Sequence, residues 1–243
     1  MSPQSAARPD VPILVVCASR DRPESLRQMV KTFCETSEMA DLAVYVDADQ
    51  IHLYMHHCDW KAEFGDRLMF TIDRQLGPNG SINALYQKHR SNYRIFGVCP
   101  DDSRFKVKGW DRFVVSEMEK FPGRIGVVSP AHNDGHYCAY PYVSREWVEI
   151  VGWYAYPEAH SFVWDTCVEM LGEATNIVYA EEAQFRMHHE CKKSENFEKY
   201  LKLDEHAFLA WCVVHRRDLV KKLRSAMWSA THPSGIIPEE LRT

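Results

Sequence analysis

No stretch of the sequence approaches the roughly 20 consecutive apolar residues that a membrane-spanning helix needs. None of the eight cysteines forms a CxxC pair, which argues against a zinc ribbon and favours buried free thiols. The turn after the first apolar run carries neither GxGxxG nor GxxxxGK(S/T), which argues against these two phosphate-binding loops. Residues 1–11 lack an apolar signal core, so we expect a flexible tail and a cytoplasmic location.

The composition fits one α/β domain of ordinary size. The chain has 243 residues, of which 45% are hydrophobic and 26% are charged, so a sizeable core and a soluble surface are both expected. The net charge of -5 gives no overall attraction to nucleic acid. Residues 186–224 nevertheless carry 10 Lys and Arg against 6 Asp and Glu, a pattern that solvated helix faces also explain.

The first half of the sequence alternates buried strands with helices. Apolar runs predict strands, and residues spaced three and four apart predict helices, one of which begins at Pro23 and another at Ser81. This alternation predicts a mostly parallel sheet flanked by helices. The strands are expected at 13–18, 42–46, 68–72, 93–98 and 125–129. The helix that begins at Ser81 should extend to residue 89, and a further helix is expected at 110–121.

The second half is less regular. Residues 130–161 show little periodicity and predict loops over a site, followed by a helix at 162–171 that Gly172 should end. Short strands are expected at 177–179 and 183–187. Two amphipathic helices should follow from residue 195. The apolar face of the second is expected to comprise Ala207, Phe208, Trp211, Val214, Leu219 and Leu223.

Polar side chains follow three of the predicted strands. Asp101-Asp102 comes directly after one strand, and two neighbouring carboxylates repel each other unless a cation lies between them. Oxygen ligands suit Mg²⁺ or Mn²⁺, and such an ion can stabilise a diphosphate leaving group. Ser19, Arg20 and Arg22 follow the first strand, and Asp47 and Asp49 follow the second. The alternative explanation of Asp101-Asp102, taken alone, is a solvated turn at a strand end.

The order of these groups resembles the GT-A glycosyltransferase superfamily, in particular its small bacterial and phage-type members. The resemblance covers about residues 13–189, and each motif is loose when taken alone. It rests on Ser19-Arg20-Asp21-Arg22-Pro23, Asp47-Ala48-Asp49, Asp101-Asp102-Ser103-Arg104 and Gly109-Trp110-Asp111. The implied fold is a GT-A, Rossmann-like α/β domain with a C-terminal helical extension.

The resemblance also implies roles for individual residues. The metal, Mn²⁺ or Mg²⁺, would be held by Asp101, Asp102 and either His188 or His189. The third position of the acidic motif is Ser103 and not Asp, which puts metal binding in doubt unless a histidine compensates. The donor nucleotide, UDP by preference, would contact Ser19, Arg20, Arg22, Asp47, Asp49, Gly77, Asn83 and Asp101.

The acceptor side is expected after the loop region. By the same resemblance, Asp165, in Val163-Trp164-Asp165-Thr166, lies where the base of an inverting enzyme would take the acceptor's proton, although an ordinary helix N-terminal Asp explains it equally well. In a retaining enzyme, Asp165 would only position the acceptor. Asp134, Gly135 and Trp164 are the acceptor candidates. The aromatic residues between the two sites could stack on sugars or form a small core.

The resulting prediction is a metal-dependent glycosyltransferase in a bacterial or phage-infected cell. It places the catalytic domain at 12–191, with a donor half at 12–103 and an acceptor half at 104–191, and the extension at 192–243. The acceptor is a hydroxyl of a glycan, a lipid-linked glycan, a protein or a hydroxymethylated base in phage DNA. Two alternatives remain: a nucleotidyltransferase, and a degenerate domain that binds a nucleotide-sugar without turnover.

Overall fold

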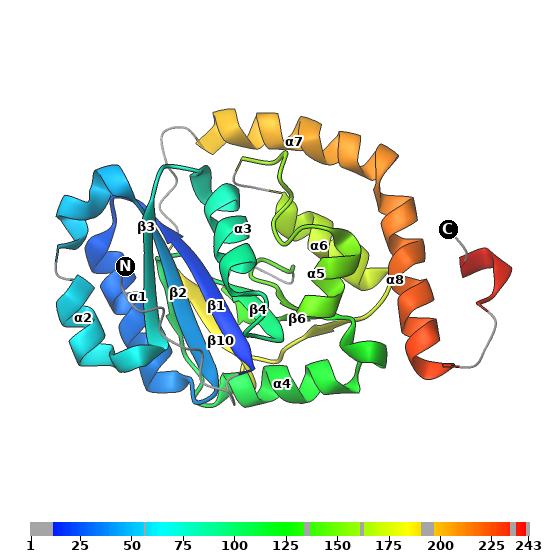
Figure 1. Cartoon of the computed structure of the whole chain (residues 1–243), viewed down its shortest axis with the longest axis horizontal. Coiled ribbons are helices and arrows are strands. Elements are labelled where there is room, and N and C mark those ends of the chain that lie inside the picture. The colour runs from blue at the N-terminus through cyan, green and yellow to red at the C-terminus, as the bar shows by residue number, and fades with distance from the viewer. Residues whose placement is uncertain are drawn as a thin grey trace.

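Parallel strands form the first half of the main sheet. The computed structural model describes residues 12–55, 57–133, 137–160, 163–190, 197–233 and 237–241. The strands of the first half are β1 (Ile13–Ser19), β2 (Ala40–Asp47), β3 (Leu68–Asp73) and β4 (Ile95–Val98). They are followed by β6 (Val127–Ser129), β8 (Tyr142–Ser144) and β9 (Ile177–Tyr179), which complete a seven-stranded sheet in the order β3-β2-β1-β4-β8-β6-β9 (Figure 1).

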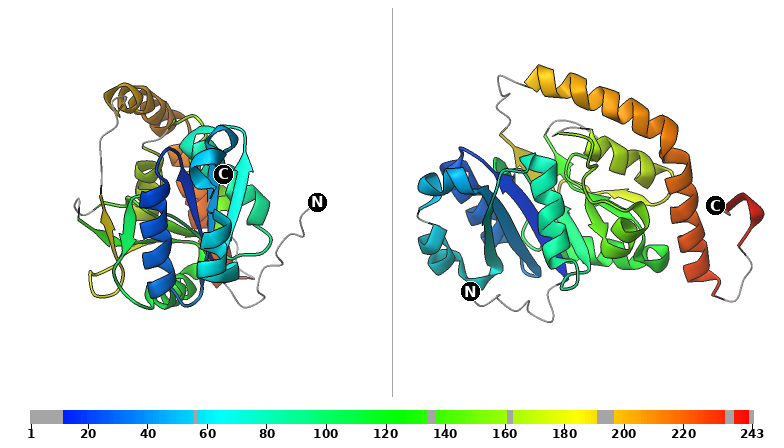
Figure 2. Two further views of the ribbon diagram at one scale, coloured as in Figure 1. Left: turned by 90° about the vertical axis from the view of Figure 1, so that its left-hand side faces the viewer. Right: turned by 45° about the horizontal axis from the view of Figure 1, so that its top comes forward.

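The strand order reverses between β1 and β4, which are parallel neighbours. The chain moves from β1 to β2 in one direction and from β3 to β4 in the other. Because such crossovers are right-handed, α1 (Pro23–Thr36) and α3 (Gly77–His89) cover opposite faces of the sheet (Figure 2). A reversal of this kind opens a crevice beyond the carboxyl ends of the two strands, where α/β proteins bind ligands.

A small second sheet lies beside this crevice. It consists of β5 (Ser103–Phe105), β10 (Arg186–His189) and β7 (Ala131–His132), in the order β5-β10-β7. β10 is antiparallel to β5, with His189 opposite Ser103. The second sheet therefore brings the histidines near residue 189 back to the segment that follows β4.

Aromatic side chains join the two sheets. Phe185 stacks on Trp110 with ring centroids 4.7 Å apart, and its other close neighbour is Tyr142 at 5.2 Å. Trp110 is the first residue of α4 (Trp110–Lys120) and is completely buried. Tyr142 lies so close to Gly97 that a Cβ at Gly97 would collide with its ring. This packing explains the need for glycine in the middle of β4.

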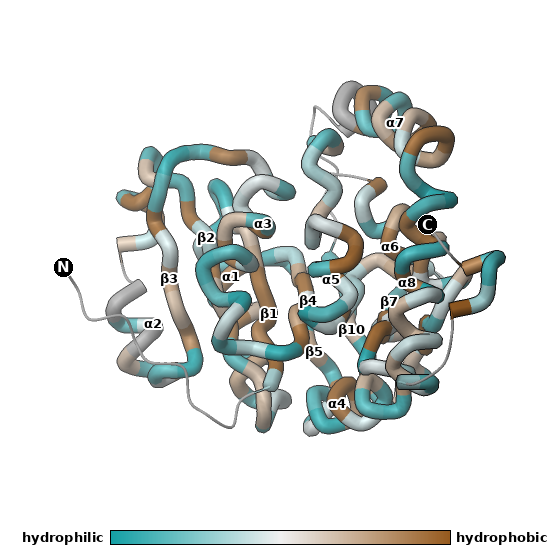
Figure 3. The backbone as a smooth tube through the Cα atoms, turned by 45° about the vertical axis from the view of Figure 1, so that its right-hand side comes forward, coloured by the Kyte–Doolittle hydropathy of each residue, from teal (hydrophilic) through white to brown (hydrophobic). Residues whose placement is uncertain are grey.

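The C-terminal helices pack on the rest of the domain. α7 (Phe197–Val214) runs along the top of the molecule in Figure 1, and α8 (Arg216–Thr231) descends beside α5 (Arg145–Val151). Trp211 of α7 is fully buried against Trp153 and Tyr156. The hydropathy colouring in Figure 3 shows apolar residues along both helices. The boundary at residue 192 remains a prediction.

The structure corrects several predicted elements. α3 begins at Gly77 with Pro78 in its first turn, so Ser81 lies inside the helix and does not cap it. α6 (Trp164–Glu173) includes Gly172, which packs against Ile177 and does not end the helix. The predicted strand at 183–187 lies instead at Arg186–His189.

The predicted loop at 130–161 contains a central strand and a helix, β8 and α5, whose segments are too short for periodicity to reveal. The apolar residues assigned to one C-terminal helix belong to two. Ala207, Phe208, Trp211 and Val214 lie on α7, where Val214 is 61% exposed, whereas Leu219 and Leu223 are buried on α8.

The remaining elements are α2 (His57–Phe64) and short 3₁₀ turns at Ala48–Tyr54, Gly65–Arg67, Pro122–Arg124 and Glu239–Leu241. The predicted free thiols are confirmed for six cysteines: Cys17, Cys34, Cys99, Cys138, Cys167 and Cys212. Within the described residues, none of the helices combines the length and apolarity required to cross a bilayer. The predicted tail at 1–11 lies outside the described residues.

Candidate donor and metal site

The polar turns that follow β1, β2 and β4 meet at one edge of the sheet. β2, β1 and β4 are neighbours and parallel, so Asp47, Ser19 and Asp101 leave the sheet in the same direction. Ser19 donates a hydrogen bond of 2.8 Å from its Oγ to Asp101 Oδ2, which joins the first and third turns directly. The predicted convergence of these groups is therefore observed.

Asp101 and Asp102 form a nearly buried carboxylate pair. They are only 5% and 6% exposed. Arg22 Nη1 lies 2.8 Å from Asp102 Oδ2 and 3.4 Å from Asp101 Oδ1, so one guanidinium group faces both carboxylates. Tyr54 OH lies 2.8 Å from Ser19 Oγ and accepts a hydrogen bond from the backbone N–H of Arg22.

His189 completes this cluster from the second sheet. Its Nε2 lies 2.9 Å from Asp102 Oδ1, and its ring contacts Tyr140 edge-on with centroids 5.6 Å apart. Asn133 holds the backbone of His189 through its side-chain oxygen, which accepts from His189 N at 2.8 Å. Because neighbouring side chains of a strand point to opposite faces, His188 points away from the aspartates. Of the two candidate histidines, the structure therefore brings His189 to the pair.

The two carboxyl groups differ in acidity. Burial raises the pKa of Asp101 to about 6, despite the hydrogen bond from Ser19 and the charge of Arg22. Burial also acts to raise the pKa of Asp102, but the contact with His189 and the charges of His189 and Arg22 outweigh it, so this pKa is below its ordinary value. Asp102 is thus the more strongly ionised member of the pair.

Arg20 joins the turns after β1 and β2. Its Nη1 donates to Asp47 Oδ2 at 2.7 Å, and its Nη1 and Nη2 contact the two carboxylate oxygens of Asp49 at 3.0 and 2.7 Å. The hydrogen bonds to Asp49 and Asp47 raise the pKa of Arg20, and Arg20 in turn lowers the pKa of Asp49. Asp47 is almost buried, whereas Asp49 and Arg20 are exposed enough to meet a ligand.

Asp165 lies in the first turn of α6, as predicted. It is partly buried, and burial raises its pKa to about 6, although its Oδ1 accepts from Thr166 N at 2.8 Å. Burial therefore outweighs the positive end of the helix, which by itself favours the charged form of Asp165. On the same helix, Glu169 accepts a hydrogen bond from Cys138 N, which lies two residues before Tyr140. A loop thus runs from the neighbourhood of Asp165 to His189.

The fold is similar to that of solved glycosyltransferases. Mannosyltransferase PcManGT from Pyrobaculum calidifontis, in complex with GDP-Man and Mn²⁺, matches with a TM-score of 0.58 and 10% identity over 95% of this chain and 79% of that chain. TarS 1-349 from S. aureus, in complex with UDP-GlcNAc, matches with a TM-score of 0.63 and 6% identity over 92% and 74% of the respective chains.

GalNAc-T7 with UDP, GalNAc and Mn²⁺ matches with a TM-score of 0.58 and 10% identity, over 91% of this chain and 54% of that chain. The fold is GT-A. This confirms the predicted fold class, and the structures with which it agrees include nucleotide-sugar and Mn²⁺ complexes. No protein-family model matches the chain, and no curated protein matches it in sequence.

Two of the residues predicted to bind the donor nucleotide, Asn83 and Gly77, lie on α3, where each has a structural role. Asn83 Oδ1 accepts hydrogen bonds from the backbone N–H groups of Tyr154 and Ala155, and its Nδ2 donates to Ala155 O. Its side chain therefore holds the loop before residue 160. Gly77 begins α3 with a φ of +73°, a conformation that glycine adopts without strain.

Three of the remaining motif and candidate residues, Asp111, Ser103 and Trp164, are buried in the protein, away from solvent. Asp111 accepts hydrogen bonds from the backbone N–H groups of Glu38 and Met39, which ties α4 to the turn before β2. Ser103 is completely buried, and its Oγ has no hydrogen-bond partner among the described residues. Trp164 is nearly buried and contacts Tyr154. Asp134 and Gly135, the other acceptor candidates, lie outside the described residues.

Sequence reasoning missed Tyr54 and Asn133, and it did not connect Tyr140 to His189. Tyr54 lies in a turn that carries no motif, 35 positions from its partner Ser19. Asn133 acts through a strand pairing between segments 56 positions apart. Spacing along the chain gives no signal for either contact, so only the folded topology identifies them.

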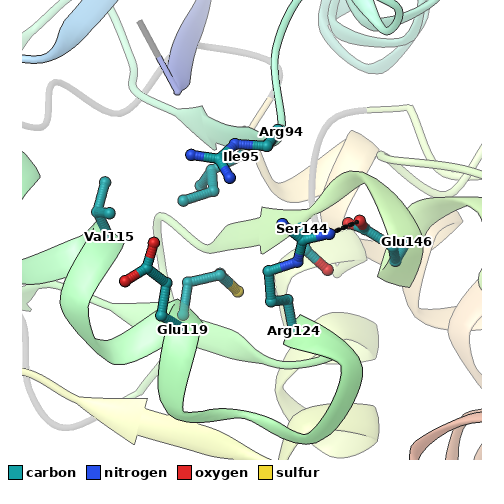
Figure 4. Close-up of a pocket in the computed structure, with 8 residues that line it drawn as sticks. Arg94, Ile95, Val115, Glu119, Arg124, Ser144 and Glu146 are labelled. Carbon is teal, nitrogen blue, oxygen red and sulfur yellow. Dashed lines mark hydrogen bonds and ion pairs between the residues drawn. The ribbon is translucent and has the colours of Figure 1, made fainter. Parts of the chain in front are cut away.

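The described residues also contain a separate pocket. Arg94, Ile95, Val115, Glu119, Arg124, Ser144 and Glu146 line it, and Arg124 pairs with Glu146 (Figure 4). Ile95 is the first residue of β4, so this pocket lies at the end of the sheet opposite Asp101 and Asp102. Within the described part of the chain, no group of three His, Cys, Asp or Glu side chains is already arranged to hold a metal ion.

Proposed function

We propose that the protein is a metal-dependent glycosyltransferase that takes its sugar from a nucleotide-sugar, with UDP as the preferred nucleotide. One observation carries the proposal. The buried Asp101–Asp102 pair, with His189 beside it, lies at the switch point of a GT-A fold, next to the polar turns that Arg20 joins through Asp47 and Asp49. Ligands of open α/β sheets bind at this point.

The turn after β2 would bind the nucleoside. Carboxylates accept hydrogen bonds from base N–H groups and ribose hydroxyls, and the nearly buried Asp47 is held in place by Arg20 at 2.7 Å. Asp49 and Arg20 would contact the exposed side of the nucleoside. Ser19 and Arg22, which already contact the carboxylate pair, would lie toward the diphosphate. Gly77 and Asn83 remain predicted donor residues, although Asn83 already holds a backbone loop.

The donor set fits a divalent cation in its chemistry, although no such trio among the described residues is already arranged around a metal position. Two carboxylates and an imidazole nitrogen suit Mn²⁺ or Mg²⁺, and a positively charged group, Arg22, already lies between the carboxylates. Asp101, Asp102 and His189 would hold the ion. When bound, it would supply positive charge to the diphosphate as the sugar leaves. His188 is not assigned as a ligand, because its side chain lies on the opposite face of β10 from that of His189.

Asp165 would act as the base of the transfer. The acceptor hydroxyl would give its proton to the Asp165 carboxylate while its oxygen forms the new bond to the anomeric carbon. The bond between that carbon and the phosphate oxygen would break, and the nucleoside diphosphate would leave with the bonding electrons. A pKa of about 6 keeps most of the carboxylate ionised at neutral pH and improves its strength as a base.

The acceptor is proposed at the level of its reacting group, a hydroxyl. Trp164, which begins α6 next to Asp165, would contact it together with Asp134 and Gly135. A glycan and a hydroxymethylated base in phage DNA are the two classes to compare. Phosphate contacts make affinity fall steeply with salt, so a salt series of acceptor binding separates DNA from a neutral glycan.

A thermal-shift panel tests the proposed donor. UDP, GDP and their sugars would be measured with and without Mn²⁺, on the native protein and on Asp102→Asn. A ligand at 100 times its Kd should add about 2.7 kcal/mol to the free energy of unfolding. We expect a Mn²⁺-dependent shift with UDP compounds that Asp102→Asn abolishes. The absence of any shift in the native protein, with metal present, would contradict the proposed donor.

A further inference from the structure

Arg22 reaches the aspartate pair from the solvent side. Its side chain is 39% exposed, whereas those of Asp101 and Asp102 are 7% and 9% exposed. The backbone N–H of Arg22 donates to Tyr54 OH at 3.2 Å, which anchors the backbone beside the carboxylate pair. The guanidinium is thus a partly exposed charge on an anchored backbone, next to two nearly buried carboxylates.

The guanidinium faces the oxygens that a metal would need. Asp101 Oδ2 accepts from Ser19, and Asp102 Oδ1 faces His189. The other two oxygens, Asp101 Oδ1 and Asp102 Oδ2, are those that Arg22 contacts. A divalent cation held by the two carboxylates would need these same oxygens and would repel the guanidinium. Both cations cannot hold the pair at once.

We propose that Arg22 is the counter-cation of Asp101 and Asp102 before metal binds, that it competes with the divalent metal for these two residues, and that the donor's diphosphate releases it. The release step rests on the proposed function. The diphosphate offers the guanidinium an alternative anion, and arginine binds phosphate oxygens through two parallel hydrogen bonds. Arg22 then leaves the aspartates as the metal arrives, so metal and nucleotide bind cooperatively.

Competition predicts the direction in which the affinity for the metal changes when Arg22 is replaced. An interaction that must break before the metal binds weakens metal affinity, and its removal therefore strengthens that affinity. A residue that only orders the site would have the opposite effect, because its loss would weaken metal binding. The affinity of Mn²⁺ for the nucleotide-free protein consequently separates the two roles without any measurement of activity.

The experiment titrates Mn²⁺ and follows the free ion by electron paramagnetic resonance. The proteins are the native chain, Arg22→Gln, Arg22→Lys and the control Arg27→Gln, whose arginine on α1 pairs with the exposed Glu63 of α2. We expect Arg22→Gln to bind Mn²⁺ about tenfold more tightly than the native protein, a usual size for such coupling. Arg22→Lys, which keeps the charge, should stay near the native value, as should Arg27→Gln.

Thermal unfolding measurements show whether the variants are still folded. Without metal, Arg22→Gln should unfold at a lower temperature than the native protein, because the buried carboxylates lose their cation. Mn²⁺ should raise its unfolding temperature more than that of the native protein. Equal or weaker Mn²⁺ binding by Arg22→Gln, or no Mn²⁺ binding by either protein, would overturn the competition.

A second titration at saturating UDP tests the release step. UDP should tighten Mn²⁺ binding by the native protein, and this gain should shrink in Arg22→Gln, which has no guanidinium to release. An equal gain in both proteins would overturn the release step. Tighter Mn²⁺ binding by Arg22→Gln, with no response to UDP or GDP in either protein, would contradict the proposed function and the release step while it supports the competition.

Discussion

His189 Nε2 lies 2.9 Å from Asp102 Oδ1, a contact between the second sheet and the turn after β4. The pairing of β10 with β5 creates it, because His189 lies opposite Ser103, the neighbour of Asp102. A shift of one residue in this pairing would present His188 instead. The register of a three-residue strand thus decides which histidine meets the acidic pair.

Replacement of His189 by Ala should weaken Mn²⁺-dependent nucleotide binding. The imidazole is the candidate nitrogen ligand, and the loss of a group that orients or binds a metal costs about 10–100-fold in affinity. His188→Ala is the matched control and should bind as the native protein does. Isothermal titration of UDP with Mn²⁺ present measures both. Equal losses in the two variants would refute the assignment of His189.

The turnover rate should depend on pH through Asp165. The carboxylate must be ionised to accept the proton, and burial raises its pKa to about 6, so kcat should rise as pH increases through about 6. The contribution of Asp165 to the stability of the fold changes with pH in the opposite direction. The folded protein holds this proton more tightly than the unfolded chain, so the group favours folding at low pH, and that contribution is lost as pH rises through about 6.

Asp165→Asn tests this prediction. It should abolish the acidic limb of the rate profile and lower kcat by about 10²–10⁴-fold. Donor hydrolysis and acceptor transfer, measured as released nucleoside diphosphate between pH 5 and 8, give the profile. A native acidic limb in Asp165→Asn would assign that limb to another group, such as Asp101, whose pKa is also raised to about 6.

Asn83→Ala should destabilise the fold. Its side chain accepts from the N–H groups of Tyr154 and Ala155 and donates to Ala155 O, and the loss of buried partners costs about 1–3 kcal/mol. Urea unfolding measures the change, with the exposed Asn92→Ala as control. If Asn83 contacts the donor as the sequence predicts, UDP affinity should fall as well. Unchanged UDP affinity with lower stability would leave Asn83 a structural role alone.

The sequence predicts the first half of the sheet because that half is regular. Apolar runs at 13–18 and 42–46 become the buried strands β1 and β2, and parallel neighbours necessarily send their following turns to one edge. The meeting of Ser19, Asp47 and Asp101 follows from this rule. The helix at Gly77 was predicted four residues too late, because Gly77-Pro78 is typical of a turn as well as of a first helical turn.

The strands of the second half could not be predicted from the sequence in the same way. β8 has three residues, and its place between β4 and β6 depends on antiparallel pairings with residues far away in the chain. Its burial comes from Gly97, whose missing side chain leaves space for Tyr142. The partners of Arg22 and His189 likewise depend on long-range geometry, so the sequence offers the candidates but not the contacts.

Asp204 offers a test of how α7 serves the acceptor side. It is completely buried, and its Oδ1 accepts hydrogen bonds from His160 N at 2.7 Å and from the His160 ring at 3.1 Å. His160 ends the described loop before α6, on which Asp165 lies. Asp204→Ala should therefore lower stability by about 1–3 kcal/mol, since it removes the partner of a backbone N–H.

The same change should separate the two halves of the proposed reaction. Among the described residues, Arg20, Asp47 and the carboxylate pair contact the turns after β1, β2 and β4 and not α7, so UDP binding with Mn²⁺ should persist below the unfolding temperature. Transfer to the acceptor should fall, because the loop that precedes Asp165 loses its anchor. Glu205→Ala, on the exposed side of the same helix, is the control. A parallel loss of UDP binding would mean that α7 supports the whole domain, whereas a loss confined to transfer would make it part of the acceptor side.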